Sequence, residues 1–188
     1  MITGIVEIKD FLPNPDEVVK VAKSCDFYSL NEHPELLERT LAWEGMRSDS
    51  LYKFDKELSD QLFHNLFMKV AEHIVGSDQF RLNYEYVGNS LFHYMTKEDV
   101  YTDSWIHADS GSLFAGVLYL NKETDKAAGT TIYIDGKKID VENEYNKLVL
   151  YPANLKHTAT SGFGDDVNDA RLSIAFFISS AAFRLSLQ

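Results

Sequence analysis

The sequence is poor in several features that would each indicate a particular class of protein. Cys25 is the only cysteine in 188 residues, which excludes internal disulfides and cysteine-based zinc or iron–sulfur sites. No apolar run approaches the roughly 20 residues that a membrane-spanning helix requires. Lys and Arg number 18 against 29 Asp and Glu, which gives a formal net charge of −11. This balance disfavours nucleic acid and anionic membranes as partners. From the lone cysteine and the missing apolar run we expect a reducing, cytoplasmic setting.

Two common catalytic motifs are also missing from the sequence. It contains neither a glycine-rich phosphate-binding loop nor the Gly-Xaa-Ser-Xaa-Gly turn of serine hydrolases. What the chain does have is 45% hydrophobic and 13% aromatic residues, which is ample for a packed core. We therefore expect a globular fold and look for its chemistry elsewhere.

The first part of the chain carries helical patterns. Asn14-Pro15, followed by acidic residues, is typical of a helix start. Leucine and other apolar residues recur every four positions over residues 58–74, which predicts an amphipathic helix that ends near Gly76. Between these segments, residues 29–53 show no regular period and predict a loop with a short helix. The lone Cys25 lies on the apolar stripe of the first helix and is expected to be a packed thiol.

From Phe80 onward the pattern changes to short β-type segments rich in aromatic and β-branched residues. The Asp135-Gly136 pair predicts a tight hairpin. The expected strands are 81–94, 105–109, 113–120, 130–134, 138–141, 147–151 and 171–178. This number of strands predicts a mainly β sandwich or jelly-roll barrel with N-terminal helices, in a single domain covering residues 1–188. We assign residues 1–79 to a helical cap and residues 80–188 to the jelly-roll core.

Three residues in the β half form a candidate metal site. His107 and Asp109 are two positions apart, so on a strand their side chains would point to the same face. His157 follows a later strand and supplies a second imidazole. Two histidines and one carboxylate on one face leave three open positions, as non-haem Fe(II) requires. A zinc site or a core histidine paired with a carboxylate is the alternative interpretation.

A candidate anion site lies at the start of the last expected strand. Arg171 and Ser173 share one face there, while the opposite face is apolar. Burying a guanidinium is costly without an anion, and its planar donors match a carboxylate. A small dicarboxylate could chelate the metal at one end and pair with Arg171 at the other. The same tripeptide recurs at residues 184–186, but in the expected C-terminal tail, so Arg171 is preferred.

Taken in order, His107-Xaa-Asp109, His157 and Arg171-Xaa-Ser173 resemble the Fe(II)- and 2-oxoglutarate-dependent dioxygenases, and the prolyl-hydroxylase-like branch in particular. The similarity spans about residues 80 to 179. It implies a double-stranded β-helix (jelly-roll, cupin-like) core flanked by helices. It also implies Fe(II), 2-oxoglutarate and O₂ as reactants, with ascorbate as an additional reductant.

Carried over to this sequence, the resemblance makes His107, Asp109 and His157 the catalytic iron ligands. Arg171 would bind the distal carboxylate of 2-oxoglutarate, and Ser173 would assist. In the prolyl-hydroxylase-like branch a tyrosine also contacts this carboxylate. Tyr94, on the preceding strand, is the candidate for that role, and Tyr86 and Tyr101 compete with it.

The resemblance favours hydroxylation of a peptidyl residue or of a free amino acid, so the expected partner is a peptide, a protein or a small-molecule substrate. An oligomer is left open. Two alternatives from other classes remain at this point. One is a cupin-like metal-binding protein or metalloenzyme that does not use 2-oxoglutarate and therefore has no need of Arg171. The other is a non-catalytic β-sandwich module, in which the histidines would be unrelated.

Overall fold

A computed structural model describes residues 4–30, 32, 43–76 and 78–187. The predicted irregular stretch 29–53 therefore lies partly outside the described residues. The elements are β1 (Val6–Ile8), α1 (Pro15–Lys23), β2 (Met46–Arg47), α2 (Leu51–Phe54), α3 (Lys56–Val75), β3 (Phe80–Met95), the 3₁₀ helix η1 (Asp103–Trp105), β4 (Phe114–Tyr119), β5 (Thr130–Ile134), β6 (Lys137–Val141), β7 (Leu148–Pro152), β8 (His157–Ala159) and β9 (Arg171–Leu187). None of the described helices has the length and apolar character needed to cross a membrane.

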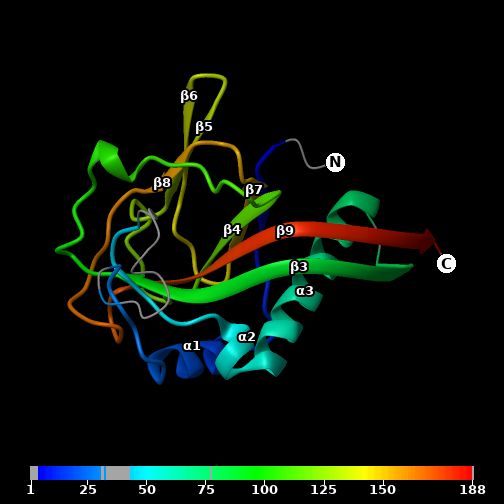
Figure 1. Cartoon of the computed structure of the whole chain (residues 1–188), viewed down its shortest axis with the longest axis horizontal. Helices are drawn as coiled ribbons and strands as arrows, with labels where there is room; N and C mark the ends of the chain where they lie inside the picture. The colour runs from blue at the N-terminus through cyan, green and yellow to red at the C-terminus, as the bar shows by residue number, and fades with distance from the viewer. Residues whose placement is uncertain (1–3, 31, 33–42, 77, 188) are drawn as a thin grey trace.

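The strands form two antiparallel sheets. Six strands pair in the order β1-β7-β4-β9-β3-β2, and three pair in the order β6-β5-β8. The helices lie on one side of the long β3–β9 ribbon, and the three-stranded sheet lies on the other side (Figure 1). The predicted mainly β, jelly-roll fold with N-terminal helices is confirmed. The first helices add a layer to the sheet rather than forming a separate body of structure (Figure 1).

The predicted start of α1 at Asn14-Pro15 and the predicted end of α3 at Gly76 are confirmed. α1 has Pro15 in its first turn, where a missing N–H does no harm. At the start of α3, the side chain of Asp55 accepts a hydrogen bond of 2.9 Å from the backbone N–H of Leu58. Gly76 ends the helix in the left-handed region, at φ 72°. The Asp135-Gly136 turn likewise joins β5 to β6 with positive φ at both residues.

Two of the predicted strands differ from the structure, since one is absent and the other is longer than predicted. Residues 105–109 do not form a strand, because η1 ends at Trp105 and only His107 makes an isolated bridge, to His157. The last strand is longer than predicted, because β9 continues beside β3 to Leu187. Arg184 is therefore part of β9, where it is exposed and lies opposite Asn83. Local sequence could not reveal this pairing, since it depends on the equal length of a distant strand.

The main core lies between the six-stranded sheet and the helices. Phe176 of β9 is fully buried there, with its ring 6.3 Å from that of Phe11 and 5.7 Å from that of Phe63 on α3. Cys25 lies at the margin of this core, and burial raises the pKa of its thiol to about 11. A smaller apolar cluster, which includes Ile132 and Val149, lies on the other side of the sheet.

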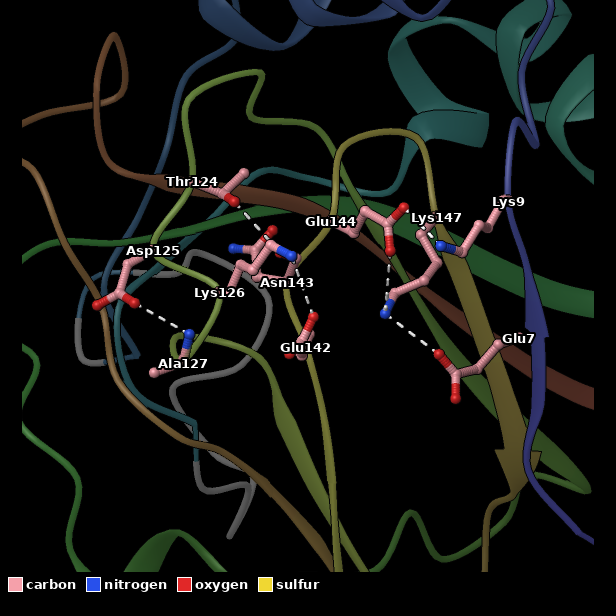
Figure 2. A network of polar contacts seen from close by, with 10 residues as sticks. All are labelled: Glu7, Lys9, Thr124, Asp125, Lys126, Ala127, Glu142, Asn143, Glu144 and Lys147. Carbon is pink, nitrogen blue, oxygen red and sulfur yellow. Dashed lines mark hydrogen bonds and ion pairs between the residues drawn. The ribbon is translucent and has the colours of Figure 1, made fainter.

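Polar contacts fix the loop that leads into β5 (Figure 2). The Thr124 hydroxyl donates to the carbonyl of Asn143 at 3.2 Å, and the Asn143 amide N–H donates to the carbonyl of Lys126 at 3.0 Å. The Asn143 side chain also donates to the carbonyl of Ala128 at 3.2 Å. Nearby, the buried Lys147 pairs with Glu7 at 3.1 Å. The carbonyls at the end of this loop are consequently held in place, which matters for the site described next.

Candidate metal and anion site

Three ligand atoms from two segments converge on one point. The Nε2 atom of His107 lies 3.6 Å from one carboxylate oxygen of Asp109, and the Nε2 atom of His157 lies 3.3 Å from the other. All three ligand atoms are within 4.8 Å of one another. Reciprocal backbone hydrogen bonds of 3.0 and 2.8 Å join the two histidines, and the Asp109 N–H donates to the carbonyl of Ala153 at 2.9 Å. Backbone pairing therefore fixes the geometry of the ligands.

The hydrogen bonds of both imidazoles determine which ring nitrogen carries a proton. His107 Nδ1 lies 2.7 Å from the carbonyl oxygen of Trp105, and His157 Nδ1 lies 3.0 Å from that of Leu155. A carbonyl can only accept, so each Nδ1 must be the donor. A neutral ring then directs its Nε2 lone pair toward the Asp109 carboxylate. Two acceptors at this distance repel each other unless a proton or a cation lies between them.

The electrostatics of the triad favour an ionised Asp109 carboxylate and a neutral His107 imidazole. Burial alone would raise the pKa of Asp109, but its hydrogen bond and attraction to His157, with smaller contributions from His107 and Arg47, lower it below 3.8. Burial lowers the pKa of His107, and the neighbouring His157 and Arg47 add to this effect. The His107 imidazole and the Asp109 carboxylate are thus in the protonation states that bind a divalent metal ion.

Arg171 is buried, with 2% of its surface exposed. Its Nε donates to the carbonyl of Ala128 at 2.8 Å, and Nη2 donates to that of Gly129 at 3.0 Å, both at the end of the loop that leads into β5. Nη1 has only the Met95 sulfur, a weak acceptor, at 3.6 Å. The guanidinium also lies 5.5 Å from the centre of the Tyr119 ring. No acidic side chain of the described residues pairs with it, so it retains donors for an anion.

The register of β3 and β9 separates the other predicted residues. Ser173 is buried beside Arg171 and donates to the carbonyl of His93 at 3.3 Å. Tyr94 lies opposite Leu172, on the face of β3 that packs against the helices. The centre of its ring lies 4.9 Å from the centre of the Phe27 ring. The structure therefore brings Ser173 to Arg171 and places Tyr94 on the opposite side of the sheet.

One cavity of about 70 Å³ connects the metal triad and the anion site. It is lined by Arg47, His93, His107, Asp109, Ala115, Gly116, Val117, Thr130, Tyr151, His157, Ala159, Arg171, Ser173, Ala175 and Phe177. An adjoining opening of about 170 Å³ shares part of this lining. A larger hollow of about 780 Å³ lies beside α1, but its lining includes none of the three candidate ligands. The small cavity is therefore the site with a defined chemistry.

Two residues that line this cavity, Tyr151 and Arg47, have no role in the sequence analysis, and Tyr119 lies beside Arg171 without being part of the lining. Tyr119 is fully buried and donates from its hydroxyl to Thr130 at 2.7 Å, with its ring near Arg171. The ring of Tyr151 lies 4.8 Å from that of His157. Arg47 enters from a two-residue strand in the segment without periodicity. The strand positions of the two tyrosines gave a weak indication that they lie near the site, whereas the sequence around Arg47 gave none.

Comparisons with known proteins support the fold. No protein-family model matches the sequence, and no curated protein matches it. A Pseudomonas putida prolyl-4-hydroxylase has a similar structure, with 18% identity, a TM-score of 0.56, and coverage of 94% of this chain and 92% of that chain. A Trichoplax adhaerens prolyl hydroxylase, solved with a hypoxia inducible factor peptide fragment, has 13% identity, a TM-score of 0.54 and coverage of 94% and 84%.

A third similar structure has a different activity. The epimerase SnoN of nogalamycin biosynthesis, solved with Fe³⁺, α-ketoglutarate and nogalamycin RO, has 16% identity and a TM-score of 0.55. The alignment covers 97% of this chain and 82% of that chain. The predicted jelly-roll fold is thus shared with prolyl hydroxylases and with other 2-oxoglutarate-dependent enzymes.

Proposed function

We propose that this protein is an Fe(II)- and 2-oxoglutarate-dependent dioxygenase that hydroxylates a peptidyl residue or a free amino acid. The observation that carries the proposal is the single cavity into which both the triad of His107, Asp109 and His157 and the guanidinium of Arg171 open. The similar solved structures support it, because they include prolyl hydroxylases and an enzyme bound to iron and α-ketoglutarate.

The donor set fits iron. His107, Asp109 and His157 would hold the ion through two imidazole nitrogens and one carboxylate oxygen, which leaves three positions open for other ligands. Bound together, Fe(II), 2-oxoglutarate and O₂ would supply an oxidative decarboxylation to succinate and CO₂ that is coupled to hydroxylation of a C–H bond. The hydrogen bonds from each Nδ1 to a backbone carbonyl would keep both rings oriented toward the metal.

Arg171 would bind the distal carboxylate of 2-oxoglutarate. Its carbonyl acceptors, Ala128 and Gly129, fix the plane of the guanidinium, which lines the cavity and keeps Nη1 paired only with the Met95 sulfur. A buried arginine that lacks an acidic partner among the described residues is unfavourable by itself and is stabilised when an anion binds to it. Ser173, on the same face of β9, would add a hydroxyl next to that carboxylate. A cupin-like metalloenzyme that makes no use of 2-oxoglutarate leaves Arg171 unexplained.

The substrate is proposed from chemistry and likeness together. A prolyl hydroxylase of the same fold was solved with a peptide, which supports a peptide or an amino acid as the partner. The net charge of −11 argues against nucleic acid. We also place the reaction in the cytoplasm, supported by a lone cysteine whose raised pKa keeps it a thiol.

Anaerobic addition of Fe(II) and 2-oxoglutarate tests the proposal. We expect a weak visible charge-transfer band that requires both components and is absent from the Asp109→Ala variant. Exposure to air should then release succinate. Metal binding without the band would overturn the proposal in favour of a metalloprotein that does not use 2-oxoglutarate. Absence of metal binding would favour the non-catalytic module.

A further inference from the structure

Arg47 is a second guanidinium in the cavity of the metal triad. It lines this cavity together with His107, Asp109 and His157. Its Nε is buried and has no hydrogen-bond partner, and no ion pair recorded among the described residues includes it. Leaving such a donor unpaired is unfavourable, which indicates that a ligand satisfies it.

The backbone holds Arg47 in place from both sides. Its N–H donates to the carbonyl of Tyr28 at 3.0 Å, and the Tyr28 N–H donates back at 2.9 Å. On its other side it lies opposite His93 of β3, whose Nε2 donates to the carbonyl of Glu44 at 2.6 Å. Gly45 lets the segment before β2 lie close to the backbone of β3. It has φ 77°, and an added Cβ would lie 2.4 Å from the carbonyl oxygen of Tyr94.

The side chain of Arg47 is also oriented. Its guanidinium lies 4.5 Å from the centre of the Trp43 ring, a distance at which a cation is attracted to the aromatic face. Stacking of this kind leaves the edge of the guanidinium free for planar recognition of a carboxylate. Arg47 is therefore a preorganised donor rather than a flexible surface arginine.

The location of Arg47 separates it from the proposed 2-oxoglutarate site. Arg171 lines the small cavity only, whereas Arg47 also lines the adjoining opening of about 170 Å³. That opening includes His107 and the aromatic residues Trp43 and Trp105. A molecule in the opening would therefore lie next to one metal ligand, with its anionic group against Arg47.

We propose that Arg47 binds a carboxylate of the primary substrate, so that the substrate is a free amino acid or a peptide whose C-terminal residue is modified. This inference rests on the proposed function, because the opening is a substrate site only if the metal and 2-oxoglutarate occupy the inner cavity. It narrows the substrate to molecules with a free carboxylate near the reacting carbon. An internal residue of a long peptide, unless it is Asp or Glu, has no such group to offer.

Acetate serves as the probe, and the Nε–H signal of Arg47 in a ¹⁵N–¹H NMR spectrum serves as the readout. The signal is assigned as the one that disappears in Arg47→Met. We expect acetate to shift it saturably in wild-type protein loaded with Zn(II) and 2-oxoglutarate. The matched variant Arg81→Met, which removes an exposed arginine of β3, should leave this shift unchanged. Absence of a saturable shift would overturn the inference.

A second measurement identifies the source of the carboxylate. Succinate release is followed with free L-amino acids, glycyl dipeptides and the C-terminal amides of both. We expect the acids to stimulate release at concentrations at least about tenfold lower than the amides, and Arg47→Met to abolish that advantage. A preference for amino acids over dipeptides would show that the carboxylate belongs to a free amino acid, and the reverse preference would show that it belongs to a peptide C-terminus. Equal response to acids and amides would contradict the proposal.

Two controls separate this inference from its premise. If the anaerobic charge-transfer band is absent, the proposed function fails, and the acetate titration of metal-free protein then decides the role of Arg47 by itself. If Arg47→Met weakens the band at a given 2-oxoglutarate concentration, Arg47 belongs to the co-substrate site. If it weakens metal affinity while the acid-over-amide preference remains, Arg47 acts on Asp109. Either of the last two results would overturn the inference.

Discussion

The two faces of the first part of β9 are equally buried but differ in polarity. On one face, Leu172, Ile174 and Phe176 are buried against the helices. On the other face, Arg171 and Ser173 are equally buried but line the cavity of the metal triad. The apolar face gains stability from the area it removes from water. The polar face gains none in this way, since its guanidinium must be compensated by hydrogen bonds, and the donors that remain are available for a ligand.

This contrast teaches that burial alone does not distinguish a core residue from a site residue. What distinguishes them is whether the buried polar atoms find all their partners within the chain. The alternation of a strand lets a single segment serve both purposes, because neighbouring side chains point in opposite directions. Substitutions on the two faces of this sheet should therefore change different measured quantities, and four substitutions can test this.

The largest effect is expected from Asp109→Ala. This change removes the one anionic ligand and leaves two imidazoles, so affinity for Mn(II) should fall by more than the roughly 100-fold that loss of an outer partner causes. Isothermal titration of metal-free protein measures it. The control Asp140→Ala, on exposed β6, should bind the metal like the wild type. Unchanged affinity in Asp109→Ala would show that the triad is not the metal site.

Phe176→Ala addresses the apolar face. Loss of a fully buried ring that contacts Phe11 and Phe63 should lower the free energy of unfolding by about 3–5 kcal/mol. Denaturant unfolding measures this loss, and metal affinity under folding conditions should stay near that of the wild type. Phe183→Ala, at a ring that is 53% exposed, should cost much less. A large loss of metal affinity in folded Phe176→Ala would contradict the separation of the two faces.

Arg171→Met makes the opposite test on the polar face. We expect affinity for 2-oxoglutarate, measured by the anaerobic band, to weaken by about 2–5 kcal/mol, as when a buried charge loses its partner. The free energy of unfolding should be unchanged or higher, because no acidic group of the described residues is left unpaired. Arg184→Met is the matched control from the exposed part of β9. Weakening by Arg184→Met alone would move the anion site to the end of β9.

His93 should give the smallest effect, through pH. Burial, followed by the charges of Arg47 and Arg171, lowers the pKa of His93 well below 6.5. In the unfolded chain the His93 imidazole is protonated below about pH 6.5, whereas in the folded protein it stays neutral. The free energy of unfolding should therefore fall as the pH drops from about 6.5 to about 5, with a slope of up to about 1.4 kcal/mol per pH unit. Urea unfolding should show a shallower slope in His93→Asn. Identical slopes would mean that His93 titrates normally.

The sequence was informative where one local pattern specifies one structure. The period of residues 58–74 predicted α3, and the Asp135-Gly136 pair predicted the β5–β6 hairpin. The ligand triad could be proposed because its residue types are restricted by metal chemistry. The shared face of Arg171 and Ser173 followed from the alternation of strands.

Other features depend on pairing between distant segments and could not be predicted. Opposite Arg171 and Ser173, β3 places Met95 and His93, and only this register shows that Tyr94 lies on the other face. Arg47 reaches the cavity because a short strand happens to pair with β3, and its local sequence carries no strand pattern. The unpredicted parts of the site are thus those whose positions are set by tertiary contacts.

The bridge between the backbones of His107 and His157 has a consequence for how the proposed site would acquire a metal ion. Because these two segments are already joined by hydrogen bonds, an incoming ion does not have to bring them together, and little additional conformational entropy is lost on coordination. The ion can then leave and be replaced while the surrounding sheets stay folded. We therefore expect reversible exchange of one metal ion for another at the proposed site, without refolding.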